Sequence, residues 1–431
     1  MIERNRFGGT CVNNGCIPTK ALVASAHAAH IANRASDFGI QIDSSVRVDM
    51  KKVKARKDAI VKQSNEGVQK WMDGLANGEV FYGHARFEGA HTVRVGDEIL
   101  ESEKIFINVG GRALMPPEMS LNGKALNNSS MMAVDFVPEH LVIVGGSYIG
   151  LEFGQMFRRF GSVVTIVEMG PRLIGREDED TSDAVRQIME KEGIQIRLNA
   201  KCIKADRKDQ KVIVGLDCSE GSKTVEGSHL LVAVGRIPNT DDLGLEKAGI
   251  QTDAKGYIQV DDQLRTNVPG IWALGDCNGR GAFTHTSYND FEIVAANLLD
   301  NDPRRLTDRI QTYALYIDPP LGRAGMSEEE VIKSGKKALI GKRPMTKITR
   351  ARVKGETEGF MKVLVDAETN LILGAAILGP EGDEIIHSIL DVMYAKAPYT
   401  VIQRAMHIHP TVTELIPTML GELKPLEPAS K

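Results

Sequence analysis

Short apolar segments recur along the chain, and most are followed by glycine or by a charged residue. Residues 141–144 (LVIV) lead into a glycine-rich turn and then into a helical pattern, whereas residues 163–167 (VVTIV) end at Glu168. Residues 103–112 and 228–236 are similar to each other, because both are apolar segments that end in Gly-Arg. Continuous apolar runs of this kind are typical of strands buried on both faces. The pattern therefore predicts an α/β fold with two related units.

The pattern changes near residue 309. Residues 311–330 predict a strand, a proline turn and the start of a helix, and residues 359–379 predict a hairpin that turns at residues 366–370. The next segment, 382–396, has apolar residues at helical spacing. They are Ile385, Ile386, Ile389, Leu390 and Met393. We expect a separate α+β unit at this end of the chain.

The turn after residue 144 matches the dinucleotide fingerprint G-x-G-x-x-G at Gly145, Ser147 and Gly150, with serine at the middle position. A strand precedes it and a helix follows, so backbone N–H groups of the turn are expected to hold a pyrophosphate. Glu168 can accept hydrogen bonds from a ribose diol, which favours NAD; Arg172 and Arg176 leave NADP possible. Further residues are expected to contact the cofactors: Tyr148, Ile149, Gly110 and Gly235.

Length and composition limit the class of protein. A chain of 431 residues is too long for one core and predicts two to four domains. Its net charge of −4 gives no reason to expect nucleic acid or an anionic membrane as a partner. The N-terminus has no apolar signal segment, and the longest apolar runs are short for a membrane span. Five cysteines do not make a disulfide framework, so we expect a cytoplasmic protein.

Two of these cysteines, Cys11 and Cys16, lie close together in FGGTCVNNGCIPTKAL. A zinc site needs about four ligands, and no second pair is present, so we expect no metal site. In a straight helix the two positions are about 7.5 Å apart along the axis, whereas a disulfide needs Cα atoms within about 7 Å. The turn must therefore be distorted, which Asn13, Asn14 and Gly15 tolerate. A strained disulfide is easier to reduce, and this favours a redox pair.

The segment Gly8 to Lys20 closely resembles the motif GGTCxNxGCxPxK of the class I pyridine nucleotide–disulfide oxidoreductases, which include dihydrolipoamide dehydrogenase, glutathione reductase and mercuric reductase. The resemblance implies that Cys16 faces FAD and that Cys11 meets the substrate. It also implies that Lys20 lies near the flavin and pairs with Glu152. The motif residues Gly9 and Thr10 are expected to contact FAD.

Two later segments extend the resemblance. In residues 271–299 an apolar strand runs into Gly275 and Asp276, and the family uses this aspartate to bind the flavin's sugar-like chain. The following helix is expected to point its positive N-terminus at the flavin. Near the C-terminus, His409 and Glu414 match the family's HPTxxE. A histidine oriented by a carboxylate can take and return a thiol proton. In the family it comes from the other subunit, which implies a homodimer.

The expected fold class is thus α/β, with two Rossmann-like dinucleotide-binding domains, for FAD and NAD, and a C-terminal α+β dimerisation domain. The expected domains are residues 1–138 and 259–308 for FAD, 139–258 for NAD(P) and 309–431 for dimerisation. Glu3 is expected to bind the adenosine ribose of FAD. By analogy with residues 141–168, the first strand and glycine-rich turn of the FAD domain would need roughly thirty residues upstream. Their absence leads us to expect a poorly soluble and largely flavin-free protein.

The predicted function is an FAD-dependent NAD(P)H oxidoreductase that reduces the Cys11–Cys16 disulfide and then a small disulfide or similar acceptor. One alternative is a non-catalytic, flavin-poor remnant. Another is a metal-ion reductase of the mercuric type, although the C-terminal cysteine pair usual there is absent and His409 is present. An NADH oxidase or peroxidase would use a single active cysteine, whereas two are present here.

Overall fold

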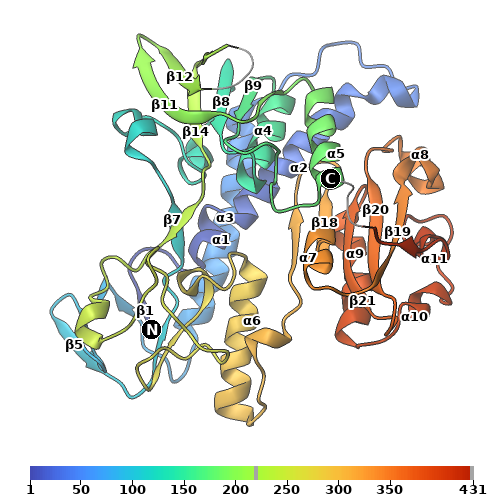
Figure 1. Ribbon diagram of the computed structural model, residues 1–431. Helices are drawn as coiled ribbons and strands as arrows, with labels where there is room; N and C mark the ends of the chain where they lie inside the picture. Colours follow the sequence, from blue (N-terminus) through green and yellow to red (C-terminus); the bar gives the residue numbers. More distant parts are fainter. Residues whose placement is uncertain (218–221, 428–431) are drawn as a thin grey trace.

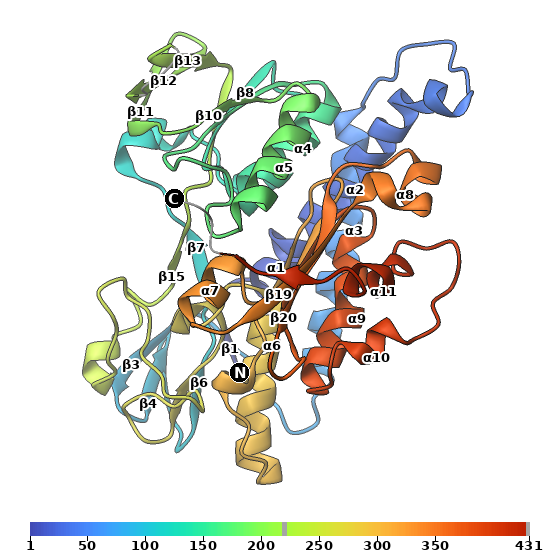
Figure 2. The same cartoon turned by 45° about the vertical axis from the view of Figure 1, so that its right-hand side comes forward.

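The computed structural model describes residues 1–217 and 222–427, and Figures 1 and 2 show three units. The first unit contains the N-terminus and helix α6 (Thr284–Ala295), which lie in the lower part of Figure 1, and its blue helices extend upward through the centre. The second unit, at the upper left, is built around strand β8 (His140–Val144), and the third, in orange and red, holds the C-terminal sheet. This arrangement confirms the mixed α/β fold that the sequence predicts.

The second unit is a parallel sheet with strand order β10-β9-β8-β14. Residues 141–144 of its central strand are almost completely buried, as expected for a strand covered on both faces. An antiparallel ribbon of three strands, β11-β12-β13, is added to it. The other bounds are β9 (Val163–Val167), β10 (Gln195–Arg197), β14 (His229–Val232), β11 (Lys201–Lys208), β12 (Lys211–Asp217), β13 (Thr224–Gly227), α4 (Tyr148–Phe160) and α5 (Glu179–Lys191).

The first unit is assembled from distant parts of the chain. Two parallel strand pairs, β1 with β2 and β6 with β16, lie beside a three-stranded meander, and β16 follows the whole second unit in sequence. This return of the chain was predicted. The bounds are β1 (Ile2–Glu3), β2 (Phe81–Tyr82), β3 (Ala85–Gly89), β4 (Thr92–Val95), β5 (Glu98–Glu101), β6 (Ile105–Ile107), β16 (Ile271–Ala273), α1 (Gly9–Asn13), α2 (Cys16–Asn33) and α3 (Met50–Asp73).

Local sequence explains the two long helices of this unit. In α2, Pro18 occupies the first turn, where its missing N–H costs no helical hydrogen bond. In α3, the side chain of the N-cap residue Asp49 accepts a hydrogen bond from Lys52 N at 3.2 Å. An antiparallel strand pair, β7 (Gly111–Ala113) with β15 (Arg236–Pro238), connects the first unit to the second.

The third unit is an antiparallel sheet of order β17-β18-β21-β20-β19-β22, covered by α9. The predicted hairpin and helix are confirmed as β20, β21 and α9. The segment 311–330 contains an additional strand, β18, between the proline turn and the helix. The bounds are β17 (Thr312–Leu315), β18 (Leu321–Gly325), β19 (Ala338–Pro344), β20 (Phe360–Asp366), β21 (Ile372–Leu378), β22 (Lys424–Pro425), α7 (Glu328–Lys333), α8 (Thr349–Lys354), α9 (Gly382–Tyr394), α10 (Thr400–Gln403) and α11 (Leu415–Leu420).

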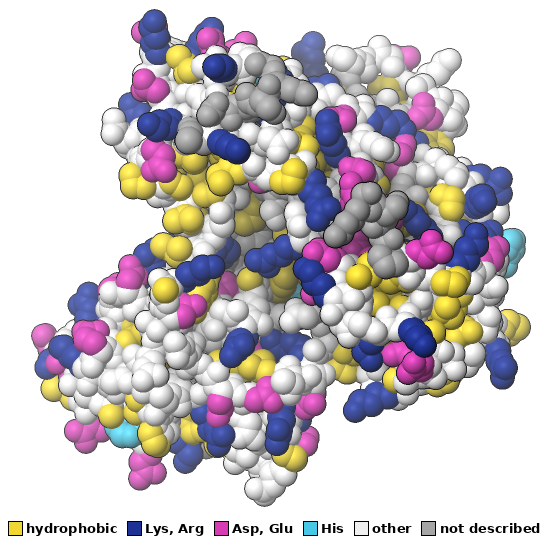
Figure 3. All heavy atoms as spheres, in the orientation of Figure 1, with side chains coloured by type: hydrophobic (Ala, Val, Ile, Leu, Met, Phe, Trp, Pro, Cys, Tyr) yellow, Lys and Arg dark blue, Asp and Glu magenta, His cyan; other side chains and the backbone are white. Residues whose placement is uncertain are grey.

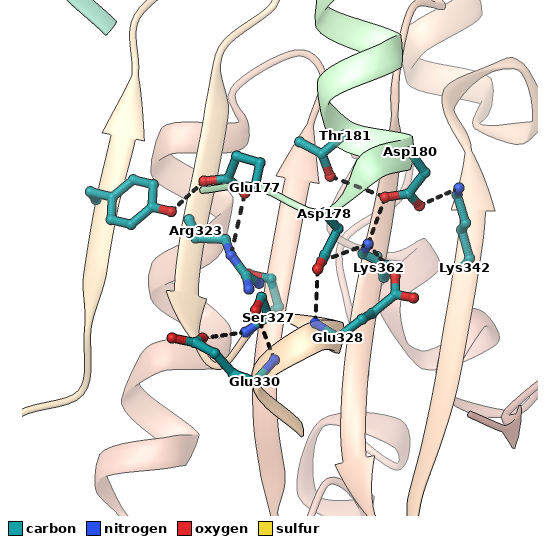
Figure 4. A network of polar contacts seen from close by, with 12 residues as sticks. Glu177, Asp178, Asp180, Thr181, Arg323, Ser327, Glu328, Glu330, Lys342 and Lys362 are labelled. Carbon is teal, nitrogen blue, oxygen red and sulfur yellow. Dashed lines mark hydrogen bonds and ion pairs between the residues drawn. The ribbon is translucent and has the colours of Figure 1, made fainter. Parts of the chain in front are cut away.

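A buried polar network fixes the second unit to the third (Figure 4). At its centre is Lys362 of β20, whose side chain is 1% exposed and whose Nζ donates to Asp178 at 2.9 Å, to Asp180 at 2.8 Å and to Glu328. Beside it, Arg323 of β18 pairs with Glu177 at 3.5 Å. We call Lys362, Asp178, Asp180 and Glu328 the lysine cluster. Because the buried ammonium group of Lys362 depends on these carboxylates, the contacts hold the start of α5 against the C-terminal sheet.

Among the residues that the structure describes, no helix is both long enough and apolar enough to span a membrane.

Candidate active site

The two cysteines lie on either side of a break between helices. Cys11 belongs to α1, and Cys16 is the first residue of α2. A Cβ on Gly15 would lie 2.7 Å from Thr10 O, so the backbone approach there requires glycine. Gly9 has a φ of +55°, which glycine also adopts readily. The distorted turn predicted from the sequence is therefore confirmed, and both cysteines are free thiols in this structure.

The surroundings make the two thiols unequal. The pKa of Cys16 is lowered to about 6, chiefly because the Cys11 thiol donates a hydrogen bond to its thiolate; burial opposes this, and Thr284 and Lys20 add to it. The same hydrogen bond, with burial, raises the pKa of Cys11. At neutral pH the reduced pair is thus a Cys16 thiolate beside a Cys11 thiol.

A threonine completes this pair. Thr284 Oγ1 lies 3.3 Å from Cys16 Sγ, although the two residues are 268 positions apart in the chain. Thr284 is the first residue of α6. Sequence reasoning missed it, because nothing in the local sequence distinguishes this threonine. The available signal was indirect: the helix expected to point at the flavin begins here.

Lys20 and Glu152 meet as the resemblance implied. Lys20 Nζ lies 3.1 and 3.0 Å from the two carboxylate oxygens of Glu152, which comes from α4 of the second unit. Two features of Tyr316 support the pair, since its N–H donates to Glu152 at 3.0 Å and Lys20 Nζ lies 4.2 Å from its ring centroid. Tyr316 is a further residue that sequence reasoning did not identify.

The glycine-rich turn has the close packing that its fingerprint implies. A Cβ on Gly145 would lie 2.3 Å from Ala233 O, and one on Gly150 would lie 1.9 Å from Gly145 O. Ser147 is the N-cap residue of α4, followed by Tyr148 and Ile149.

Glu168 closes this turn from the other side. Its carboxylate accepts hydrogen bonds from Gly146 N at 2.6 Å and from Gly170 N at 2.7 Å, so it lies directly beside the turn. A ribose held at the turn would therefore meet a carboxylate whose position is fixed by the backbone.

One cavity of about 4500 Å³ joins these features, between the first and second units. The space-filling view in Figure 3 shows the molecule hollowed there, with apolar and basic side chains around the opening. Most of the predicted site residues line this cavity. They are Glu3, Gly9, Thr10, Cys11, Cys16, Lys20, Gly110, Gly145, Ser147, Tyr148, Ile149, Glu152, Glu168, Gly235 and Asp276. Gly150 and Gly275 are not among the lining residues.

The chemistry of the lining fits FAD on one side and a nicotinamide nucleotide on the other. Asp276 follows β16, and its carboxylate lies 3.6 Å from Arg236 at the cavity wall. Burial raises the pKa of Asp276, and Arg236 opposes this shift. A carboxylate there is an acceptor for ribityl hydroxyls. Glu3 ends β1, and its Oε1 accepts a hydrogen bond from Asn5 N at 2.7 Å, so it can act in the same way on a ribose.

His409 and Glu414 form a pair away from this cavity. His409 Nδ1 lies 2.9 Å from Glu414 Oε2, so the carboxylate orients the imidazole as predicted. The His409 side chain is 74% exposed and does not line the cavity of its own chain. Met406 and Ile408 beside it are also highly exposed.

The lysine cluster is the place where carboxylates of the described residues could surround an ion, because Asp178, Asp180 and Glu328 converge there. The ammonium group of Lys362 already lies among these three carboxylates. Its charge replaces that of a cation at this position.

Comparison with known proteins agrees with the geometry. Residues 1–290 match the family model described as pyridine nucleotide-disulphide oxidoreductase, and residues 312–420 match the dimerisation domain of the same family. A dihydrolipoyl dehydrogenase of Thermus scotoductus is 33% identical over 419 residues, which cover 96% of this chain and 89% of the relative. The probable pyridine nucleotide-disulfide oxidoreductase RclA of Escherichia coli is 34% identical over an alignment of 433 positions, covering 98% and 93%.

Solved structures of RclA from Escherichia coli, described as an HOCl-induced flavoprotein disulfide reductase, superpose with a TM-score of 0.87 at 33% identity. That match covers 97% of this chain and 93% of the other. One of the structures is a Cu(II) complex. The matched family consists of enzymes that use FAD and NAD(P)H, and these matches make the predicted flavin-free remnant and mercuric-type alternatives unfavourable. The chain belongs to the pyridine nucleotide-disulphide oxidoreductases, the FAD-dependent enzymes that pass electrons from NAD(P)H to a redox disulfide.

Proposed function

We propose that this enzyme uses NADH to reduce a small disulfide through Cys11 and Cys16. The observation that supports it best is that one cavity is lined by both cysteines, by the Lys20–Glu152 pair and by the nucleotide-type turn at Gly145. The overall reaction takes NADH, a proton and the disulfide to NAD⁺ and two thiols.

The FAD held by these residues would supply the redox chemistry that connects the two-electron donor NADH to the disulfide. The residues of this chain have distinct roles in the proposal. Asp276 and Glu3 would hold the sugar portions of FAD, with Gly9, Thr10 and Gly110 shaping the wall. Lys20, held by Glu152, places a positive charge beside the reacting groups. Cys16 carries the thiolate next to the flavin, and Cys11 attacks the substrate disulfide.

We propose that two copies of the chain share each site. His409 is oriented by Glu414 but is largely exposed in its own chain, beside the exposed residues Met406 and Ile408. In a dimer, the imidazole of His409 would lie near Cys11 of the partner, take the proton of the attacking thiol and return it to the leaving thiolate. We propose the predicted division into domains with one change at the end of the NAD domain. The packing of Leu245 and Ile258 with Phe87 of the first unit favours ending the NAD domain near residue 235 rather than 258.

We propose NADH as the preferred nucleotide, because the fixed carboxylate of Glu168 would lie beside a 2′-phosphate. Arg172 and Arg176 line the same cavity, so NADPH remains a second donor. The small number of cysteines favours a reducing compartment such as the cytoplasm for an enzyme that works as a dithiol.

The test is NADH oxidation by the full chain supplied with FAD, against lipoamide, glutathione disulfide and cystine. We expect Cys11→Ser and Cys16→Ser each to abolish disulfide reduction. Cys277→Ser is the matched control, since Cys277 is buried and outside the cavity lining, and it should keep the parent rate. Equal disulfide reduction by the parent and by Cys16→Ser would contradict the proposal.

Cu(II) belongs in the same panel of acceptors, because a solved relative at 33% identity is a Cu(II) complex and thiolates suit Cu(I). Cysteine-dependent reduction of Cu(II) in preference to every disulfide would replace the disulfide proposal by a metal-reductase one.

A further inference from the structure

The hydroxyl of Thr284 lies where it can act on the sulfur that we assign to the flavin side. Its Oγ1 is 3.3 Å from Cys16 Sγ, within hydrogen-bond distance for sulfur. Thr284 begins α6, a helix of 12 residues whose positive N-terminal end therefore also faces the thiol. The contact joins the first and last segments of the first unit, so it forms only in the folded protein.

Other donors near Cys16 are already engaged. Lys20 Nζ lies within 3.1 Å of both oxygens of Glu152, so its charge is largely balanced by that carboxylate. Cys11 donates to Cys16 only while both are reduced, and this donor disappears when Cys11 joins the disulfide. The hydroxyl of Thr284, in contrast, is present whether the two cysteines are reduced or form the disulfide.

We propose that Thr284 is a catalytic residue whose hydroxyl donates a hydrogen bond to the Cys16 thiolate, and that it thereby stabilises the reduced pair relative to the disulfide. The proposal rests on the function proposed above. When an electron pair enters the disulfide, the S–S bond breaks, one proton goes to Cys11, and Cys16 keeps its negative charge. A hydrogen bond to an anion is stronger than one to a neutral disulfide sulfur. The hydroxyl therefore favours reduction.

The first test measures thiolate formation rather than activity. In the Cys11→Ser background of the full chain, Cys16 is followed by iodoacetamide alkylation across pH, with mass spectrometry of its peptide. Cys16 is exposed when no flavin covers it, so the alkylation is done with FAD-free protein, in which the reagent reaches the thiol. Thr284→Val keeps the shape but removes the hydroxyl, Thr284→Ala removes both, and Thr284→Ser keeps the hydroxyl. We expect alkylation at pH 6 to fall about fivefold in the Val and Ala variants, equivalent to a rise of one unit in the pKa of Cys16, and less than about twofold in Thr284→Ser.

The second test measures the redox equilibrium of the intact cysteine pair in glutathione buffers at pH 7. Raising the pKa of Cys16 from about 6 by one unit shifts the equilibrium about fivefold toward the disulfide. We expect this shift in Thr284→Val and Thr284→Ala but not in Thr284→Ser.

Unchanged alkylation and redox equilibrium in Thr284→Val would overturn the proposal. An effect seen in Thr284→Val but not in Thr284→Ala would be due to the shape of the side chain and would also overturn the proposal. A Thr284→Ser variant that behaves like Thr284→Val would overturn it as well, because serine keeps the hydroxyl. Failure of the proposed function gives a different result from failure of this proposal. If the proposed function is wrong, the Cys16→Ser variant still reduces disulfides with NADH.

Discussion

Lys20 and Glu152 are 132 positions apart in the chain, yet Lys20 Nζ lies 3.0 and 3.1 Å from the two carboxylate oxygens of Glu152. The pair connects α2 of the first unit with α4 of the second, at the wall of the shared cavity. The Glu152 side chain is 7% exposed and that of Lys20 is 34% exposed. The carboxylate therefore depends on this lysine far more than the lysine depends on the carboxylate.

Replacing Lys20 by Met should destabilise the fold, because it leaves a buried carboxylate with only the Tyr316 N–H as an observed donor. We expect a loss of about 1–3 kcal/mol in the free energy of unfolding, below the range for fully buried pairs because Lys20 is partly exposed. Urea unfolding measures it, with Lys20→Arg as the control that keeps the charge. Equal stability of Lys20→Met and Lys20→Arg would show that charge balance is unimportant here.

The low pKa of Cys16 depends first on Cys11. Because this pKa of about 6 lies below that of an ordinary thiol, Cys16 is mainly thiolate at pH 7. Cys11→Ala removes the donor, so alkylation of Cys16 at pH 7 should slow by about tenfold or more. Cys11→Ser retains a hydroxyl donor and should lie close to the parent. The measurement is the pH dependence of iodoacetamide alkylation, and identical profiles for Ala and Ser would contradict this account.

His27 should make stability depend on pH. Its Nδ1 lies 2.8 Å from Asp318 Oδ2, and this hydrogen bond raises the pKa of His27. The stabilisation is thus fully present below about pH 6.5, the unfolded value, and is lost as pH rises through the higher folded value. The His27 side chain is 45% exposed, so the effect should be under about 1 kcal/mol. Unfolding of the parent and of His27→Gln should differ at pH 5.5 and converge by about pH 8.5. A constant difference across this range would exclude the titration.

The lysine cluster should be among the most sensitive places in the fold. Lys362→Met leaves three neighbouring carboxylates without their central cation and should cost about 3–5 kcal/mol of unfolding free energy. Lys342→Met is the matched control. Lys342 contacts Asp180 alone among these residues and is 42% exposed, so its loss should cost less than about 1 kcal/mol. Similar losses of unfolding free energy in the two variants would show that the lysine cluster does not hold the second and third units together.

Glu168 should control the choice of nucleotide. Removing its charge in Glu168→Ala lifts one repulsive contact with a 2′-phosphate, so the ratio of kcat/KM for NADH over NADPH should fall about tenfold. Glu190→Ala is the control, because Glu190 belongs to the same unit but does not line the cavity. An unchanged ratio would show that the charge of Glu168 does not control the choice of nucleotide.

The parts of the fold that were predictable have a local signal. Residues 141–144 and 163–167 form strands because uninterrupted apolar runs fit a sheet buried on both faces. Strand β18 was missed because Gly322 and Arg323 interrupt its apolar pattern. The structure buries that arginine against Glu177, a partner far away in sequence. Lys362 is likewise a charged residue inside a fully buried strand, but the apolar residues around it were enough to predict β20.

In the active site, too, the predictable features are those with a local signal in the sequence. The cysteine turn was predictable, since its strain and its residue types lie within one short segment. The Lys20–Glu152 pair followed from family resemblance. The contacts of Thr284 and Tyr316 were not predictable, because each depends on tertiary packing that brings together distant segments.

The lysine cluster also limits which substitutions this protein can accept during evolution. Lys362 is almost completely buried among three carboxylates, so replacing it alone leaves them without their central cation, and replacing the carboxylates takes the partners of the buried ammonium group away. Viable descendants must therefore either keep all four residues or replace several of them nearly together. The cluster ties residues 178–180 to residues 328 and 362 as a single inherited unit, even though none of them touches the reacting sulfurs.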